Sequence, residues 1–156
     1  MAKHCKPAQH YSGVGHVIMK MRPVRIRFYD SKDAAFLSTV FFDAVRKAGL
    51  RDYSQAQVAA WAPAKPDPAS VEARATDGRL TLVAVNEVDE PIAYGDLEAN
   101  GHIDHLFCRP KNIGTGVAST LYDRLEQEAC EQESPGFLWR PAKQRAGYSS
   151  GRVSSR

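Results

Sequence analysis

The stretch from residue 102 to residue 127 constrains the fold of this chain more than any other part of the sequence. It begins with an apolar run that predicts a buried strand, and Pro110 then ends the strand because proline has no N–H to donate. A turn of small residues at 114–119 leads directly into a helix whose apolar residues recur at three- and four-residue steps. A strand followed by such a turn at a helix N-terminus is suited to hold phosphate, because free N–H groups and the helix dipole both favour an anion.

Gly114 and Gly116 by themselves do not identify a phosphate-binding motif, and a tight turn without a ligand is the alternative. No Gly-Lys-Ser/Thr follows them, which excludes a Walker loop. Ser119 stands at the third glycine position of the dinucleotide-binding fingerprint, and no βαβ unit with a suitably placed acidic residue follows. The motif therefore has to be interpreted together with the strand and the helix around it.

The whole segment resembles the central strand, pyrophosphate loop and helix of the GNAT superfamily of acetyl-CoA-dependent N-acetyltransferases. The loop of that family reads Gln/Arg-x-x-Gly-x-Gly/Ala. The run Ile113-Gly114-Thr115-Gly116-Val117-Ala118 fits at both small positions but has Ile113 in place of the leading Gln or Arg. A second segment, 52–63, is similar to the stretch after the first helix in one bacterial branch of these enzymes. The resemblance covers roughly residues 25–132.

The resemblance implies that an acetyl group passes from acetyl-CoA to a primary amine of a small molecule or a peptide. It places the coenzyme on the end of the strand and on the loop, at Leu106, Phe107, Cys108, Ile113, Gly114, Thr115, Gly116, Val117, Ala118 and Ser119. Tyr53 and Trp61 are expected to line the amine pocket, because that region caps the acceptor site in relatives; a plain core role is the alternative for Trp61. Arg109 and Lys111 are candidate contacts for coenzyme phosphates, and plain solvated surface charge is the alternative.

His102 and Asp104 are the candidate catalytic residues. The period of two along a strand places them on one face and His105 on the other. Histidine titrates near neutrality and suits removal of a proton from the attacking amine, directly or through a water. His102 also lies at about the position where some relatives have a glutamate base. The alternative is that His102 is merely exposed beside the Asn100-Gly101 turn and that Asp104 bonds to neighbouring groups.

The remaining sequence predicts an α+β domain. Strands are expected at 24–28, 80–85, 91–98 and 103–108, and helices at about 31–48, 55–61, 68–76 and from 117 to at least 129. Ser54 and Gln57 form a capping box, Gly49 is expected to stop the first helix, and Asn100-Gly101 predicts a hairpin. The order predicts a GNAT-like mixed, mainly antiparallel sheet flanked by helices, with incomplete C-terminal strands.

Three regions follow from these patterns: a flexible leader at 1–22, a GNAT-like acetyltransferase domain at 23–133 and an atypical basic, disordered tail at 134–156. The family continues past this helix with further strands and a tyrosine near the thioester sulfur, and the tail shows no such pattern. A truncated or frame-altered copy of an acetyltransferase is one hypothesis. A catalytically degenerate acyl-CoA-binding domain is another. A third is a fragment that completes its sheet with a partner chain, since an open strand edge favours strand addition or a homodimer.

Charge and cysteine content bear on the partners and the compartment. The net charge of +3 is mild, and outside the tail the basic residues are scattered, so nucleic acid is not expected as a partner. No apolar run is long enough to span a membrane. The three cysteines are odd in number and widely spaced, and they form neither a zinc pattern nor an obvious disulfide framework. We therefore expect a cytoplasmic protein without a metal site.

Overall fold

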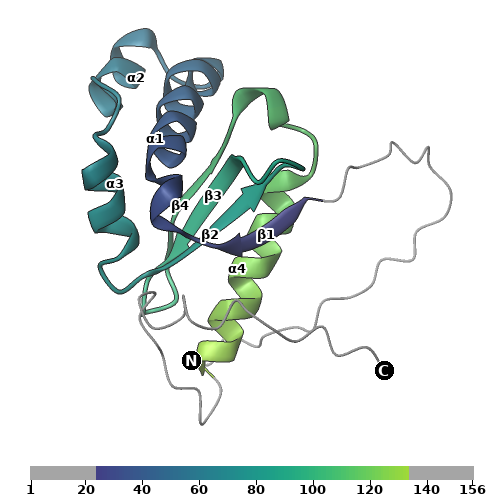
Figure 1. Cartoon of the computed structure of the whole chain (residues 1–156). Helices are drawn as coiled ribbons and strands as arrows, with labels where there is room; N and C mark the ends of the chain where they lie inside the picture. The colour runs from purple at the N-terminus through teal and green to yellow at the C-terminus, as the bar shows by residue number, and fades with distance from the viewer. Residues whose placement is uncertain (1–23, 134–156) are drawn as a thin grey trace, which may run out of the picture.

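The computed structural model describes residues 24–133, and the predicted leader, the predicted tail and any C-terminal strands lie outside the described residues. The strands are β1 (Arg25–Phe28), β2 (Leu80–Val85), β3 (Pro91–Leu97) and β4 (Ile103–Cys108). The α-helices are α1 (Ala34–Asp43), α2 (Gln55–Trp61), α3 (Pro68–Ala75) and α4 (Val117–Glu133). These elements follow one another in the predicted order and confirm the predicted α+β fold class (Figure 1).

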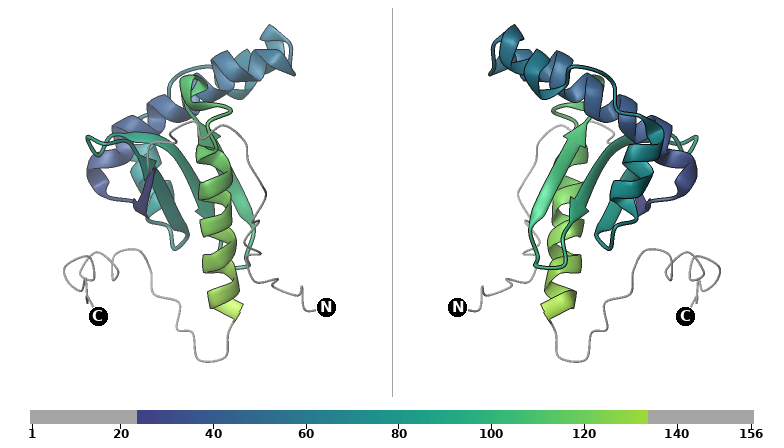
Figure 2. Two further views of the ribbon diagram at one scale, coloured as in Figure 1. Left: turned by 90° about the vertical axis from the view of Figure 1, so that its right-hand side faces the viewer. Right: turned by 90° about the vertical axis from the view of Figure 1, so that its left-hand side faces the viewer.

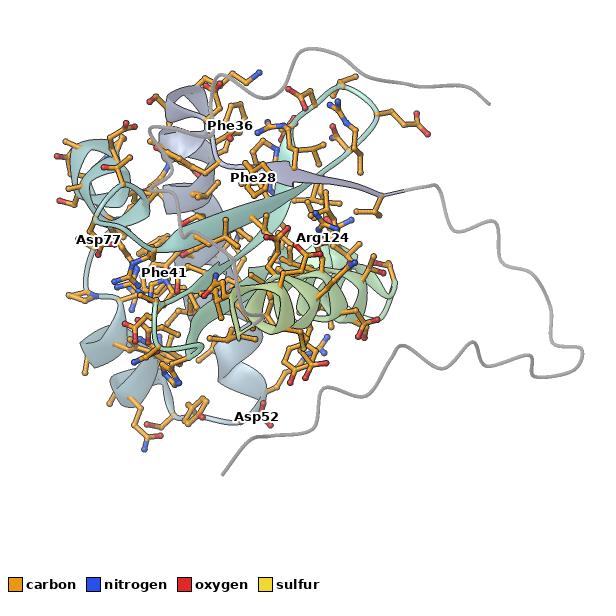
Figure 3. All side chains as sticks on the ribbon, turned by 90° about the horizontal axis from the view of Figure 1, so that it is seen from below. Phe28, Phe36, Phe41, Asp52, Asp77 and Arg124 are labelled. Carbon is orange, nitrogen blue, oxygen red and sulfur yellow. The ribbon has the colours of Figure 1, made fainter. Side chains whose placement is uncertain are left out.

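The sheet has the strand order β1–β2–β3–β4, and every neighbouring pair is antiparallel. β2 and β3 are buried along their whole length because helices cover both faces, with α4 on one side and α1 and α3 on the other (Figure 2). In Figure 3, Phe41 lies among the side chains on the α1 side, away from Arg124 on α4. Within the described range β4 is an edge strand, and its last residue leads into the loop that precedes α4.

The α4 side of the sheet depends on a glycine in the middle of β3. Leu121 and Leu125 of α4 are fully buried against the sheet. A Cβ built at Gly95 would lie 2.6 Å from Leu125 Cδ1 and 3.1 Å from the carbonyl oxygen of His105. The first distance is shorter than real Cβ contacts and the second is tight, so Gly95 allows α4 to pack closely on β3.

The first helix differs from the prediction at its C-terminal end. α1 is followed by a single π turn, Ala44–Ala48, and a 3₁₀ turn, Gly49–Arg51. The π turn ends at Ala48, and Gly49 caps it as predicted, with a helical φ of −60° and its N–H donated to the Ala44 carbonyl. A Cβ at this position would lie 3.4 Å from Cγ2 of Val58 on α2, an ordinary contact distance, so the packing does not require glycine here.

Two local predictions are confirmed in the turns. Ser54 Oγ accepts from the Gln57 N–H at 3.2 Å, and Gln57 Oε1 accepts from the Ser54 N–H at 2.9 Å, which is the predicted capping box. Gly101 has a φ of 84° in the hairpin between β3 and β4, and its N–H donates to the Glu98 carbonyl at 2.9 Å. The hairpin therefore begins β4 one residue after His102, at Ile103.

Further observations concern the cysteines, metal binding and membranes. Cys108 is free and half-buried, whereas Cys130 takes part in a disulfide, which differs from the expectation that the cysteines form no disulfide framework. Between residues 24 and 133, no helix has the length and apolar character needed to cross a bilayer. The same residues contain no group of three or more His, Cys, Asp or Glu side chains that could hold a metal ion.

Candidate functional site

The loop between β4 and α4 turns sharply at two glycines. It begins with a 3₁₀ turn, Pro110–Asn112. Gly114 and Gly116 then have φ angles of 80° and 84°, left-handed conformations that glycine adopts without strain. Thr115 is held between them, because its N–H and its hydroxyl both donate to the Asn112 carbonyl. The glycines of the sequence motif are therefore required by the backbone of this loop.

This loop presents a group of free backbone donors. Five N–H groups donate to no acceptor within residues 24–133, those of Gly114, Gly116, Val117, Ala118 and Ser119. The next amide, of Thr120, is paired with the Gly116 carbonyl at 3.0 Å. Val117 begins the 17-residue helix α4, so the partial positive charge of the helix dipole lies at the same place. The loop therefore has the geometry that a site for a phosphate or diphosphate requires.

Side chains add little positive charge to this loop. Arg109 donates to Glu90 Oε1 at 2.6 Å and is only 14% exposed, so its charge is already partly paired, and its contact with phosphate stays a prediction. Lys111 is exposed and remains available. The Ile113 side chain is 41% exposed and has no group that could donate to an anion. An anion at this loop would therefore be held mainly by backbone N–H groups.

β4 contains a bulge in its middle. Gly95 pairs with Leu106, whereas Leu97 pairs with Ile103, so β4 has one residue more than β3 between these two pairs. The N–H of His105 donates to the Asp96 carboxylate at 3.1 Å. The bulge therefore interrupts the ladder next to a buried side chain of β3.

Beyond the bulge, backbone groups of β4 point toward the edge of the sheet. The N–H of Arg109 donates to the Ile92 carbonyl at 2.9 Å, which fixes the alternation of hydrogen bonds along this antiparallel pair. By that alternation, the N–H and C=O groups of Leu106 and Cys108 are directed away from β3. These groups are available to a ligand that lies along the edge of β4.

The bulge changes which side chains of β4 share a face. Asp104 is paired with Arg74 of α3, and His105 lines a pocket with the same arginine, so both lie on the α1–α3 side. His102 lies in the hairpin turn, is exposed, and borders an open depression of about 650 Å³ together with Tyr122 of α4. The predicted placement of His102 with Asp104 and opposite His105 is wrong. His102 belongs to the turn, where the alternation does not apply, and the bulge brings His105 to the face of Asp104.

Asp104 is held in an ion-pair network. Its carboxylate accepts from Arg74 and lies 3.5 Å from Arg79 Nη1. The hydrogen bond from Arg74 holds the pKa of Asp104 below its usual range. A carboxylate of this kind is a weak base near neutral pH, so its position does not favour proton removal.

A buried polar cluster lies behind β4. Asp96 of β3 is 1% exposed, accepts from Arg74 Nε at 3.1 Å, and lies 3.4 Å from Arg79 Nη1. The Tyr94 hydroxyl is 3.2 Å from His105 Nδ1. Burial lowers the pKa of His105, and the Asp96 carboxylate acts in the opposite direction, so the imidazole is neutral at pH 7. Sequence reasoning missed this cluster because its members come from separate elements. A carboxylate within the buried run 91–97 is the signal that could have found it.

Tyr53 and Trp61, the two predicted acceptor residues, lie next to each other. Their ring centroids are 6.2 Å apart, and Trp61 is also 6.2 Å from Phe107 of β4. Both side chains are about half exposed, at 51% and 53%. Phe107 contacts Phe41 of α1 and His105, with centroid distances of 5.0 and 5.1 Å. The two predicted substrate residues therefore form an exposed aromatic surface that leads to β4 and the buried cluster.

Comparison with known proteins identifies a family and several solved structures that this chain resembles. A family model described as an acetyltransferase (GNAT) domain matches residues 49–139. A crystal structure from Rhodopseudomonas palustris, described as a GCN5-related N-acetyltransferase and as an aminotransferase of class II, is 34% identical with a TM-score of 0.67. The match covers 77% of this chain and 72% of that one. No curated protein matches the chain.

Two further structures are similar in fold. A GNAT superfamily phosphinothricin acetyltransferase from Sinorhizobium meliloti, solved in complex with acetyl-CoA, is 17% identical with a TM-score of 0.53. That match covers 68% of this chain and 59% of the relative. A ribosomal-protein-alanine N-acetyltransferase from Brucella melitensis is 22% identical with a TM-score of 0.53, over 70% of this chain and 68% of the relative.

Proposed function

This chain belongs to the GNAT acetyltransferase family, and on that premise we propose that it transfers an acetyl group from acetyl-CoA to a primary amine of a small molecule or a peptide. The observation that carries the proposal is the group of free amides at the start of α4, which suits a coenzyme diphosphate. The edge of β4 supports it too, because Leu106 and Cys108 offer backbone groups to a pantetheine arm. When bound, acetyl-CoA supplies the thioester that the amine attacks.

The backbone performs two tasks in the proposed reaction. The amides of Gly114 and of residues 116–119 hold the diphosphate, which fixes the direction of the coenzyme along β4 and positions it for attack. A β4 N–H, of Leu106 or Cys108, donates to the thioester oxygen as negative charge develops there. The predicted coenzyme surface comprises residues 106–108 and 113–119. Within it, Ile113 offers apolar side-chain atoms only, and Val117, whose side chain is buried, takes part through its N–H.

His105 is the base that we propose, in place of His102 and Asp104. It lies at the bulge of β4, is neutral at pH 7 because burial lowers its pKa, and borders the aromatic surface through Phe107. A neutral imidazole accepts a proton from the attacking amine, directly or through a water. His102 lies in the exposed hairpin, and Asp104 is held by Arg74. The geometry therefore favours His105, which strand alternation had assigned to the face opposite Asp104.

The acceptor surface in this proposal is the aromatic pair on α2 and the segment before it. Tyr53 and Trp61 are half exposed, and Trp61 contacts Phe107 two residues after His105. Aromatic side chains with large exposed area are typical of binding surfaces. We therefore propose that the amine approaches β4 over this pair.

Two alternatives rest on particular observations. A coenzyme-binding domain without catalysis is favoured by Ile113, where the family motif has Gln or Arg. A domain that completes its sheet with a partner chain, including a second copy of itself, is favoured by the edge position of β4 within residues 24–133.

Release of free thiol from acetyl-CoA separates these candidates. Polyamines, aminoglycosides, amino acids and peptides are offered in turn as acceptors. The proposed enzyme releases thiol only when its amine is present. An inactive coenzyme-binding domain is stabilised against heat by acetyl-CoA but releases no thiol with any amine. If acetyl-CoA neither raises the melting temperature nor reacts, both the enzyme and the coenzyme-binding domain are contradicted.

A further inference from the structure

A pocket of about 170 Å³ lies on the side of the sheet opposite α4. Side chains of α1 and α3 form its apolar wall, among them Leu37, Phe41 and Val71. The sheet contributes four polar residues, Thr81, Tyr94, Asp96 and His105, and α3 contributes two more, Ser70 and Arg74. The apolar wall of the pocket therefore comes from the helices, whereas most of its polar groups come from the sheet.

The volume of the pocket limits the size of its occupant. An apolar protein cavity of about 150 Å³ is known to hold benzene. A pocket of about 170 Å³ therefore holds one six-membered ring with a small substituent, or a branched aliphatic group of similar size. The apolar wall around Phe41 favours such a group over a fully polar one, because its burial removes apolar surface from water.

The Thr81 hydroxyl is a polar group in this pocket that makes no hydrogen bond among the described residues. Thr81 lines the pocket and is 4% exposed. A buried hydroxyl without a partner is unfavourable, so a ligand group that pairs with it is stabilised. Threonine populates more than one χ1 rotamer, so rotation can redirect the hydroxyl without backbone movement.

The charged groups around the pocket already pair with one another. Asp96 accepts from Arg74 and from the N–H of His105, and Arg79 lies close to it. Arg74 also donates to Asp104. His105 adds no charge at pH 7, because burial lowers its pKa. A charged ligand would lose its hydration here without finding a free counter-charge, so the pocket favours a neutral one.

We propose that this pocket binds a neutral, ring-sized group that carries one hydroxyl, with the ring against Phe41 and Val71 and the hydroxyl paired with Thr81. Phenols and benzylic alcohols are the class of compound with this chemistry. The group belongs either to the amine acceptor or to a separate small molecule. The pocket is formed without any part of the diphosphate loop, so its occupancy and coenzyme binding are tested separately.

Titration of ¹⁵N-labelled protein with phenol and with benzene tests this proposal. We expect phenol to saturate, to shift the amides of Thr81, Tyr94 and His105, and to bind about five- to tenfold more tightly than benzene. In Thr81→Val the preference for phenol disappears. Thr39→Val is the matched control, because the Thr39 hydroxyl already donates to a carbonyl within α1 and lies outside the pocket. It keeps the wild-type preference.

Filling the pocket provides a second test. Ala75→Leu adds volume from α3 and is expected to abolish the binding of both probes. Val71→Phe fills the pocket from the same helix and replaces Ala75→Leu if that variant does not fold. The proposal is overturned if phenol does not saturate in the wild type, if benzene binds as tightly, or if a folded filled variant binds phenol unchanged.

The source of the hydroxylated ring is distinguished by steady-state acetylation in the presence of phenol. Inhibition competitive with the amine shows that the ring belongs to the acceptor. Unchanged acetylation at saturating phenol shows that a separate small molecule uses the pocket. Both results require the pocket to bind phenol and therefore support it as a site for this class of group.

Discussion

Gly116 contributes both to the conformation of the loop and to the proposed binding of diphosphate. Its φ is 84°, and its N–H is one of the five free donors. Gly116→Glu places a carboxylate beside those donors, where it competes with the diphosphate and repels it. We expect the affinity for acetyl-CoA to fall by about 100-fold or more, equal to about 2.7 kcal/mol, in a calorimetric titration.

Gly101→Glu is the matched control for this substitution. Gly101 has the same φ of 84° in the hairpin at the other end of β4, and a Cβ there would meet nothing within 4 Å. The variant therefore has the same backbone strain without a carboxylate near the loop. Equal loss of affinity in both variants would contradict a specific role of the loop.

His105 predicts a pH dependence of stability. Burial lowers its pKa below the unfolded value of about 6.5, so the unfolded chain takes up this proton at a higher pH than the folded one. The contribution to stability is complete above about pH 6.5 and is lost as the pH falls through the folded pKa. Urea unfolding between pH 7.5 and pH 5 measures the loss, and His105→Gln is expected to remove it. An identical pH dependence in His105→Gln would show that another group causes it, such as the neighbouring Asp104, whose pKa is lowered by Arg74.

The elements that sequence reasoning located are those whose signals act over a few residues. The Ser54–Gln57 capping box and the Asn100-Gly101 hairpin depend on groups two or three positions apart, and both are present. The bulge in β4 depends on Asp96 of another strand, which accepts from the His105 N–H. The alternation of residues along β4 cannot show a contact with another strand. For this reason the sequence assigns His105 to the wrong face of the sheet.

The packing of α4 on β3 gives a prediction at the scale of elements. Gly95→Ala places a methyl group 2.6 Å from Leu125 Cδ1, so the fully buried Leu125 side chain has to shift within the core. We expect the free energy of unfolding to fall by about 1–3 kcal/mol in urea titrations, as overpacked cores do.

A double-mutant cycle tests the cause of that loss. Leu125→Ala removes the atom that the new methyl group would meet. If the clash is the cause, Gly95→Ala destabilises the Leu125→Ala protein clearly less than the wild type. Additive losses would place the strain elsewhere, at the His105 carbonyl.

The aromatic surface on α2 predicts a separate effect on the acceptor. Trp61 is 53% exposed and contacts Tyr53 and Phe107, so Trp61→Ala should cost little stability. We expect the KM for the amine to rise by about tenfold while the KM for acetyl-CoA stays within twofold of wild type. Leu50→Ala, at a similarly exposed apolar residue, serves as the control. A change in the coenzyme KM alone would argue against an acceptor role for Trp61.

In the whole molecule, the two faces of the sheet have different proposed roles. β4, at the edge of the sheet, has residues on both faces (Figure 1). α4 on one face presents the anion site, whereas α1 and α3 on the other face enclose the polar cluster and its pocket. The net charge of +3 is too small to draw an anion to one particular place, so local amides have to do so. The sequence could predict the loop, because its donors belong to consecutive residues. It could not predict the cluster, whose residues the fold brings together.

The central claim is that the amides at the start of α4 hold the coenzyme diphosphate. Titration of ¹⁵N-labelled protein with coenzyme A, compared with pantetheine, tests it most directly, because pantetheine lacks the diphosphate. The account predicts saturable shifts and slower hydrogen exchange at the five free amides of the loop with coenzyme A, and no such changes there with pantetheine. Unchanged amides at saturating coenzyme A, or the same changes with pantetheine, would contradict it.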